Sequence, residues 1–144
     1  MNPVSVVVIT KNEGARLAEC LQSVSWADEI VVLDDESTDN TVEVAKSFGA
    51  KVHRRKMDIE GKHRNYAYSL ARNEWVLSLD ADERVTPELR QEILETLQGK
   101  PSCNGYTIPR KNFVGNVWAR YGGMYPSAQL RLFRKGIFRY DEQA

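Results

Sequence analysis

Residues 75–82 read WVLSLDAD, an apolar, β-prone run that ends in two aspartates, Asp80 and Asp82. Ligands of open α/β sheets bind just beyond the carboxyl ends of the strands, which is where these aspartates are expected. Side chains two apart in an extended segment point to the same side, so both carboxylates can converge on one cation. Mg²⁺ is typically held by one or two carboxylates together with substrate phosphates. The run therefore predicts a buried strand with a divalent-cation site at its end.

Strands and helices alternate around this run. Short, apolar, β-branched segments predict strands at residues 4–10, 29–34, 51–54 and 75–79. Apolar residues at helical spacing predict helices at 17–24 and 42–48, and residues 61–70 are expected to be helical as well. Thr86-Pro87 is typical of the start of another helix that continues through Leu97. This order predicts an α/β fold with three α/β/α layers and a mainly parallel sheet.

The character of the chain changes after Pro101. Residues 106–109 and 129–134 look like strands that flank a glycine-rich loop at residues 112–126. This loop carries the aromatic residues Phe113, Trp118, Tyr121 and Tyr125. Aromatic residues on such a loop favour a lid or a binding subsite, and we expect the last three on the acceptor side of a site.

Composition excludes several classes of protein. The 144 residues include 20 basic and 20 acidic side chains, so no overall basic field favours nucleic acid. The two cysteines lie far apart, and Cys20 is expected to be a buried free thiol. No apolar run approaches the ~18 residues that a membrane span needs. The first residues lead directly into a strand without a signal peptide, so we expect a cytoplasmic protein.

Polar clusters follow three of the predicted parallel strands, at residues 10–13, 34–39 and 80–83. Because the carboxyl ends of parallel strands meet at one sheet edge, the clusters indicate a single site. Asp34 and Asp35 are like charges that need a favourable partner. A nucleobase imide, a ribose diol or a basic side chain would serve.

A basic group at residues 61–65, GKHRN, stands where a helix begins. Helix N-termini with a nearby arginine bind anions, and Arg64 can grip a phosphate, although a solvated basic face is the alternative. Other phosphate motifs are absent: Lys56 stands where a P-loop needs glycine, and the first strand lacks Gly-x-Gly-x-x-Gly. Neither His53 nor His63 has a metal-ligand spacing, and both are interpreted as surface residues.

Four segments in order, VVVITKNE (6–13), IVVLDDESTDNT (30–41), GKHRN (61–65) and LDADE (79–83), resemble the family 2 glycosyltransferases of the GT-A fold. The stretch YPSAQLRLFR (125–134) further resembles the branch that contains lipopolysaccharide-core glycosyltransferases. The resemblance implies an inverting transfer from a nucleotide-diphosphate sugar, with a UDP-sugar favoured and with Mg²⁺ or Mn²⁺ as cofactor. The acceptor would be a glycan or glycolipid, and the full-length protein could touch the inner face of the plasma membrane.

The resemblance also implies roles for single residues. Thr10 and Asp35 would line the base and ribose pocket, with Asn12, Glu13 and Asp34 beside it. Arg64 would approach the nucleotide. Asp80 would face ribose or metal, and Asp82 would be the direct metal ligand.

The resemblance divides the chain into a donor-binding region at residues 1–100 and the start of an acceptor-side region at residues 101–144, within one domain. Relatives usually supply the catalytic base from a region beyond the equivalent of Ala144. We therefore expect a truncated chain, and the alternative is that Asp141 or Glu142 serves as the base.

Rival functions fit the sequence less well. A phosphatase that uses an aspartate pair carries it after the first strand, which here ends at Thr10. A sugar nucleotidyltransferase needs a glycine-rich basic loop there, and residues 11–14 read KNEG. A non-catalytic nucleotide-binding fragment stays open as the alternative function.

Overall fold

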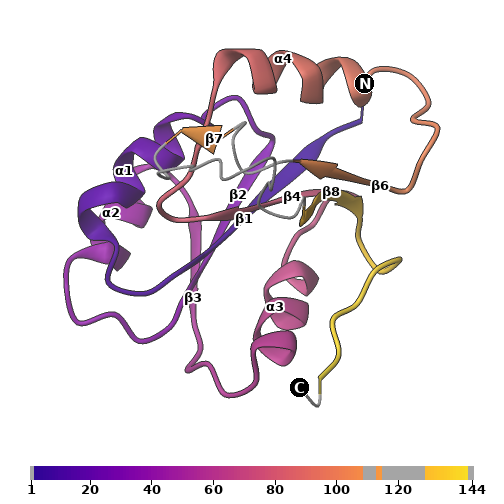
Figure 1. Cartoon of the computed structure of the whole chain (residues 1–144). Coiled ribbons are helices and arrows are strands. Elements are labelled where there is room, and N and C mark those ends of the chain that lie inside the picture. Colours follow the sequence, from indigo (N-terminus) through magenta and orange to yellow (C-terminus); the bar gives the residue numbers. More distant parts are fainter. Residues whose placement is uncertain (1, 109–112, 115–128, 143–144) are drawn as a thin grey trace, which may run out of the picture.

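The chain is described by a computed structural model over residues 2–108, 113–114 and 129–142. Its centre is a six-stranded sheet in the order β3-β2-β1-β4-β8-β6 (Figure 1). The strands are β1 (Val4–Thr10), β2 (Glu29–Asp34), β3 (Lys51–Arg54), β4 (Trp75–Asp80), β6 (Gly105–Ile108) and β8 (Gln129–Arg134). The four strands β1 to β4 are parallel, whereas β8 is antiparallel to β4 and to β6. The predicted, mainly parallel α/β sheet is thus confirmed.

In the described part of the chain, four helices connect these strands. They are α1 (Gly14–Gln22), α2 (Thr41–Ser47), α3 (Glu60–Ser69) and α4 (Pro87–Thr96). The start of α4 follows the sequence prediction, because the Thr86 side chain accepts a hydrogen bond from the Leu89 amide and Pro87 occupies the first turn.

The sheet separates two apolar layers. One layer packs α1, α2 and α4 against side chains such as Val6, Val8 and Leu77. The other packs Ala67 and Tyr68 of α3 against neighbouring strand residues. Helices therefore cover both faces, with α3 opposite the other three, as the three-layer prediction required (Figure 1).

The antiparallel direction of β8 brings the later part of the chain to the carboxyl end of β4. Trp75 pairs with Arg134 and Leu77 with Leu132, so the beginning of β8 lies beside the end of β4. A second, two-stranded sheet pairs β5 (Arg84–Val85) with β7 (Phe113–Val114). Strands β6 and β8 thus join the core sheet, and β8 lies beside the end of β4, the acidic edge that carries Asp80.

Within the described residues, none of the helices is both long and apolar enough to cross a membrane.

Candidate functional site

Asp80 ends β4 at the carboxyl edge of the parallel strands and lies between two arginines. One oxygen, Oδ1, is 3.8 Å from Nη2 of Arg64 on α3. The other, Oδ2, is 4.0 Å from Nη2 of Arg131 on β8. The Asp80 side chain is 36% exposed, so the carboxylate is open to a ligand from solvent. This edge therefore carries one accessible anion flanked by two cations.

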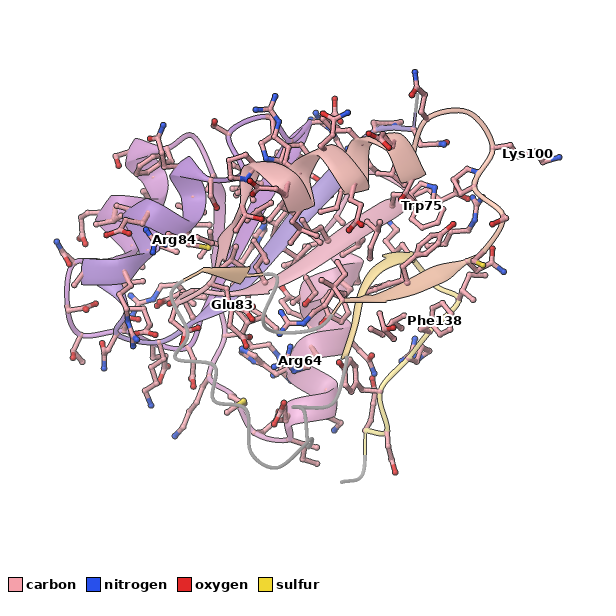
Figure 2. The ribbon with its side chains drawn as sticks, turned by 45° about the horizontal axis from the view of Figure 1, so that its top comes forward. Arg64, Trp75, Glu83, Arg84, Lys100 and Phe138 are labelled. Carbon is pink, nitrogen blue, oxygen red and sulfur yellow. The ribbon has the colours of Figure 1, made fainter. Side chains whose placement is uncertain are left out.

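Arg64 lies on α3 (Figure 2), and other side chains hold it beside the Asp80 carboxylate. Its Nε donates to Glu60 at 2.9 Å, and the Tyr140 ring lies 5.7 Å from its guanidinium carbon. Burial lowers the pKa of Arg64, but Tyr68, Glu60 and Asp80 raise it more, so the net shift is upward. The side chain is a fixed cation, as the anion-site interpretation of residues 61–65 needs.

Asp82 does not share the surroundings of Asp80. The Glu83 amide donates to the Asp80 carbonyl at 3.0 Å, so the chain turns after β4 and the alternation argument fails at Asp82. The Asp82 carboxylate is 25% exposed and lies 3.9 Å from Nη1 of Arg16 on α1. A cation shared by both aspartates would draw each of them from an arginine.

Negative charge nevertheless gathers at this turn. The Cys20 thiol lies 3.8 Å from the Asp80 carbonyl oxygen and is buried, as predicted. Burial, and then the charges of Glu83, Asp82 and Asp80, raise the pKa of Cys20 to about 12. The Cys20 thiol thus lies within the electrostatic influence of three carboxylates.

Glu83 and Arg131 form a buried pair that the sequence analysis did not single out. Arg131 donates to Glu83 from both terminal nitrogens, at 2.5 and 2.9 Å. The exposed fractions are 0% for the Glu83 side chain and 4% for that of Arg131. No local signal joins residues 48 apart, because the pairing depends on β8 running antiparallel to β4.

Asp34 is directed into the protein. Its carboxylate accepts from the Ser37 hydroxyl at 2.5 Å and from the Ser37 amide at 2.9 Å. Arg54 on β3 lies 3.4 Å away, and the Asp34 side chain is 0% exposed. Of the partners considered for this carboxylate, the basic side chain is the one observed.

Asp35 is also largely buried, and it lies near α3. Its Oδ1 accepts from the Met57 amide at 2.9 Å, its Oδ2 is 4.0 Å from Lys11, and its side chain is 13% exposed. His63 packs nearby and is 1% exposed, so the prediction that His63 lies on the surface was wrong. The cause is that the first turn of α3 packs inward, where His63 Nδ1 lies 3.1 Å from Arg55 Nη1.

The loop after β1 is fixed by the loop after β2. Asn12 has a φ of 52° and accepts at its side-chain oxygen from the Thr38 amide at 2.8 Å. The left-handed region is one that asparagine tolerates better than most residues. Glu13 pairs with Arg16 at 2.6 Å. The Thr10 hydroxyl is buried and has no hydrogen-bond partner among the described residues.

The end of the described chain lies along α3. Glu142 accepts from Asn65 and from Arg139, both at 2.9 Å. These partners, Asn65 first, lower the pKa of the Glu142 carboxyl. The carbonyl of Asp141 lies against Gly61. Trp118, Tyr121 and Tyr125, the predicted acceptor-side residues, are outside the described residues.

With the residues that the structure describes, a divalent cation would need a bound ligand to complete its coordination. The described residues contain no cluster of three or more His, Cys, Asp or Glu side chains arranged for a metal. Two partly exposed carboxylates, completed by diphosphate oxygens and water, still match the donors that Mg²⁺ takes. Asp80 and Asp82 are the residues that would supply them.

The fold and its acidic edge define a class, the α/β proteins of the GT-A type. Solved structures with the same arrangement include residues 1–349 of TarS from S. aureus in complex with UDP-GlcNAc. That match has a TM-score of 0.57 and 30% identity, and it covers 66% of this chain and 31% of TarS 1–349. Mannosyl-3-phosphoglycerate synthase from Rubrobacter xylanophilus matches with a TM-score of 0.61 and 26% identity, over 72% of this chain and 38% of that structure.

The chain belongs to glycosyl transferase family 2, whose profile matches residues 5–143. An uncharacterized glycosyltransferase of Rickettsia typhi is 45% identical over 94 residues, which cover 65% of this chain and 32% of the relative. The lipopolysaccharide core biosynthesis glycosyltransferase LpsC of Rhizobium meliloti is 28% identical over 96% of this chain and 53% of LpsC. The chain thus spans about a third to a half of the length of these relatives.

Proposed function

We propose that this chain binds the donor for a glycosyl transfer in which a sugar moves from a nucleoside diphosphate to an acceptor hydroxyl. The observation that carries the proposal is Asp80, an accessible carboxylate held between Arg64 and Arg131 at the carboxyl edge of the parallel strands. The TarS structures with UDP and UDP-GlcNAc, each 30% identical to this chain, support a UDP-sugar as the donor. In this proposal residues 1–100 bind the donor and residues 101–144 begin the acceptor side.

The nucleoside is assigned to the sheet edge beside Asp35, next to the loops that follow β1 and β2. Asp35 keeps its backbone contact to Met57 through one oxygen, which leaves the other to accept from a ribose diol or a base. Thr10 and Asn12 are assigned to the same nucleoside site, with Glu13 beside it. Asp34 is assigned an indirect part, because its oxygens already hold Ser37 and so fix the loop that carries Asp35.

The diphosphate is assigned to the space between Arg64 and Asp82. Arg64 would bind phosphate oxygens through its charged nitrogens. Asp82 and Asp80 would hold Mg²⁺ or Mn²⁺, which neutralises the charge that builds on the departing diphosphate. Arg16 and Arg131 compensate these carboxylates before a ligand arrives.

In the reaction, the bond between the sugar C1 and the diphosphate oxygen breaks and the acceptor oxygen bonds to C1 from the opposite side, which inverts the configuration. The acceptor hydroxyl gives its proton to a carboxylate base. Glu142 is a weak candidate for this base, because two hydrogen bonds stabilise its charged form. We therefore assign the base to the part of the longer relatives that this chain does not span.

Similarity to LpsC supports an acceptor in lipopolysaccharide or another cell-surface glycan. Such an acceptor would be a glycan or a glycolipid, with transfer at the cytoplasmic side of the membrane. The aromatic residues Trp118, Tyr121 and Tyr125 are our candidates for contacts to its sugar rings.

Measurements of donor hydrolysis and of sugar transfer distinguish the proposed glycosyltransferase function from that of a nucleotide-binding fragment without turnover. The chain incubated with UDP-GlcNAc and Mn²⁺ should release UDP slowly, and a longer form that includes the following region should release it faster by roughly 10²–10⁴-fold with acceptor present. If the longer form also binds UDP-GlcNAc but never cleaves it, the domain is a binding module.

A further inference from the structure

We propose that the buried pair of Glu83 and Arg131 sets the strength with which Asp80 binds a divalent cation. Neither side chain would touch the cation, and both would act through Asp80. The inference rests on the proposed function and adds to it a control of cation affinity built into the core.

The pair is a well-formed bidentate ion pair. Arg131 donates to Oε1 of Glu83 at 2.5 Å and to Oε2 at 2.9 Å, and both side chains are almost completely buried. Parallel N–H···O bonds to a carboxylate fix geometry as well as energy. In Figure 2, Glu83 lies at the turn that follows β4, and Arg64 lies on α3. The orientation of the Arg131 guanidinium is therefore tied to that turn.

The same pair is connected to Asp80 from two sides. Oε1 of Glu83 accepts from the backbone amide of Asp80 at 2.8 Å. Arg131 donates to the carbonyl of Ser78 at 3.2 Å, and its Nη2 lies 4.0 Å from Oδ2 of Asp80. A single guanidinium thus faces two carboxylates, one buried and one open to solvent.

These contacts create a competition for the charge of Arg131. A cation that binds Asp80 must do so beside this guanidinium, which attracts the same carboxylate and repels the cation. Glu83 reduces this opposition because it compensates most of the arginine charge at shorter range. Without the Glu83 charge, Arg131 would hold Asp80 more strongly. Without the Arg131 charge, Asp80 would keep Arg64 as its one arginine of this pair and would bind the cation more readily.

A structural role alone predicts a different result. Breaking a buried ion pair at either residue lowers stability, because a charge is left without compensation. Stability would then fall in both variants, while the cation affinity of the molecules that remain folded would stay the same. Opposite shifts in affinity are therefore the signature of the proposed control.

The experiment compares Glu83→Gln and Arg131→Gln with the parent chain. Calorimetry measures UDP binding with Mn²⁺ and with EDTA, below the melting temperature of each variant. Glu29→Gln is the matched control, since Glu29 is a buried carboxylate paired with Lys51 at 2.7 Å at the start of β2, away from Asp80.

Glu83→Gln should lose roughly 10- to 100-fold in Mn²⁺-dependent affinity, the usual effect of a changed partner of a metal ligand. Arg131→Gln should bind Mn²⁺ and UDP more tightly than the parent, so either variant tests the proposal if the other does not fold. Both variants and Glu29→Gln should match the parent in EDTA.

Unchanged Mn²⁺-dependent affinity in the folded variants would overturn the inference alone. A parent chain that binds no UDP with Mn²⁺ would instead contradict the proposed function on which the inference rests.

Discussion

The side-chain amide of Asn65 forms a reciprocal pair of hydrogen bonds with the backbone of Tyr140. The Tyr140 amide donates to Asn65 Oδ1 at 2.9 Å, and Asn65 Nδ2 donates to the Tyr140 carbonyl at 3.0 Å. The Asn65 side chain thus forms the two hydrogen bonds that a neighbouring strand would otherwise form with this backbone. It ties residues 139–142 to the helix that carries Arg64.

Substituting Gly61 should detach this segment. A Cβ at Gly61 would lie 1.9 Å from the Asp141 carbonyl oxygen, which is too close for any real contact. In Gly61→Ala, the Tyr140 amide should exchange its hydrogen faster by about tenfold or more, since the loss of two hydrogen bonds costs roughly 1–3 kcal/mol. Hydrogen exchange measured by mass spectrometry follows this amide. Lys62→Ala, at the exposed neighbouring position, is the control, and equal protection in both variants would refute the packing described here.

Protonation of His63 should destabilise the fold. Burial, and then the charge of Arg55, lower the pKa of His63 below its ordinary value of 6.5, despite opposing contributions from Asp35 and Asp58. The unfolded chain then binds the proton more readily, so stability is fully present above pH 6.5 and falls as the pH drops toward the folded-state pKa. The slope from this one group cannot exceed about 1.4 kcal/mol per pH unit.

Urea unfolding between pH 7 and pH 5 measures this dependence. His63→Asn keeps an acceptor for Arg55 but does not titrate, so its stability should change less over the same range. Identical pH profiles for the parent and His63→Asn would show that His63 is not the group responsible.

The two cysteines should differ in reactivity. Cys20 is buried and its pKa is raised to about 12, whereas Cys103 is exposed. Because the thiolate is the reactive form, a disulfide reagent at pH 8 should modify one thiol quickly and the second only on unfolding. Cys103→Ser should abolish the fast phase. Two thiols that react at the same rate in the native protein would contradict the burial of Cys20.

Asp34 and Asp35 should respond differently to the loss of charge. Asp34→Asn weakens charge-assisted bonds to Ser37 and should cost about 1–3 kcal/mol of stability. Asp35→Asn keeps an acceptor for the Met57 amide and should instead weaken UDP binding in the absence of metal. Thermal unfolding and calorimetry in EDTA measure the two effects. Unchanged UDP affinity in Asp35→Asn would remove Asp35 from the nucleoside pocket.

The sheet was predictable from sequence because each of its parallel strands is encoded by a short, local run of residues. Residues 4–10 and 29–34 are short β-branched runs, and the observed strands β1 and β2 have the same bounds. The alternation of such runs with amphipathic helices then fixes a parallel order. The acidic edge follows from this topology, so its place after β4 could be predicted as well.

Long-range pairing was not predictable in the same way. Arg131 reaches Glu83 because β8 runs antiparallel to β4, and no periodicity in the sequence reports that direction. The expectation that Asp80 and Asp82 point to the same side depends on an extended backbone. The chain turns at residues 81–82, so this expectation fails at Asp82. His63 was misplaced because a polar residue in a basic run can still lie on the inner side of a helix.

A comparison of the parent chain with Asp82→Ala tests the central claim most directly. Calorimetry measures the affinity of each for UDP, once in the presence of Mn²⁺ and once in EDTA. The Asp82 side chain is 25% exposed at the turn after β4, and thermal unfolding of the variant checks that it folds as the parent does. The parent should bind UDP more tightly with Mn²⁺, and Asp82→Ala should lose this metal-dependent gain while keeping the affinity measured in EDTA. Glu92→Ala, an exposed carboxylate on α4, should behave as the parent. Equal Mn²⁺-dependent affinity in Asp82→Ala and the parent would contradict the assignment of this edge as a cation and nucleotide site.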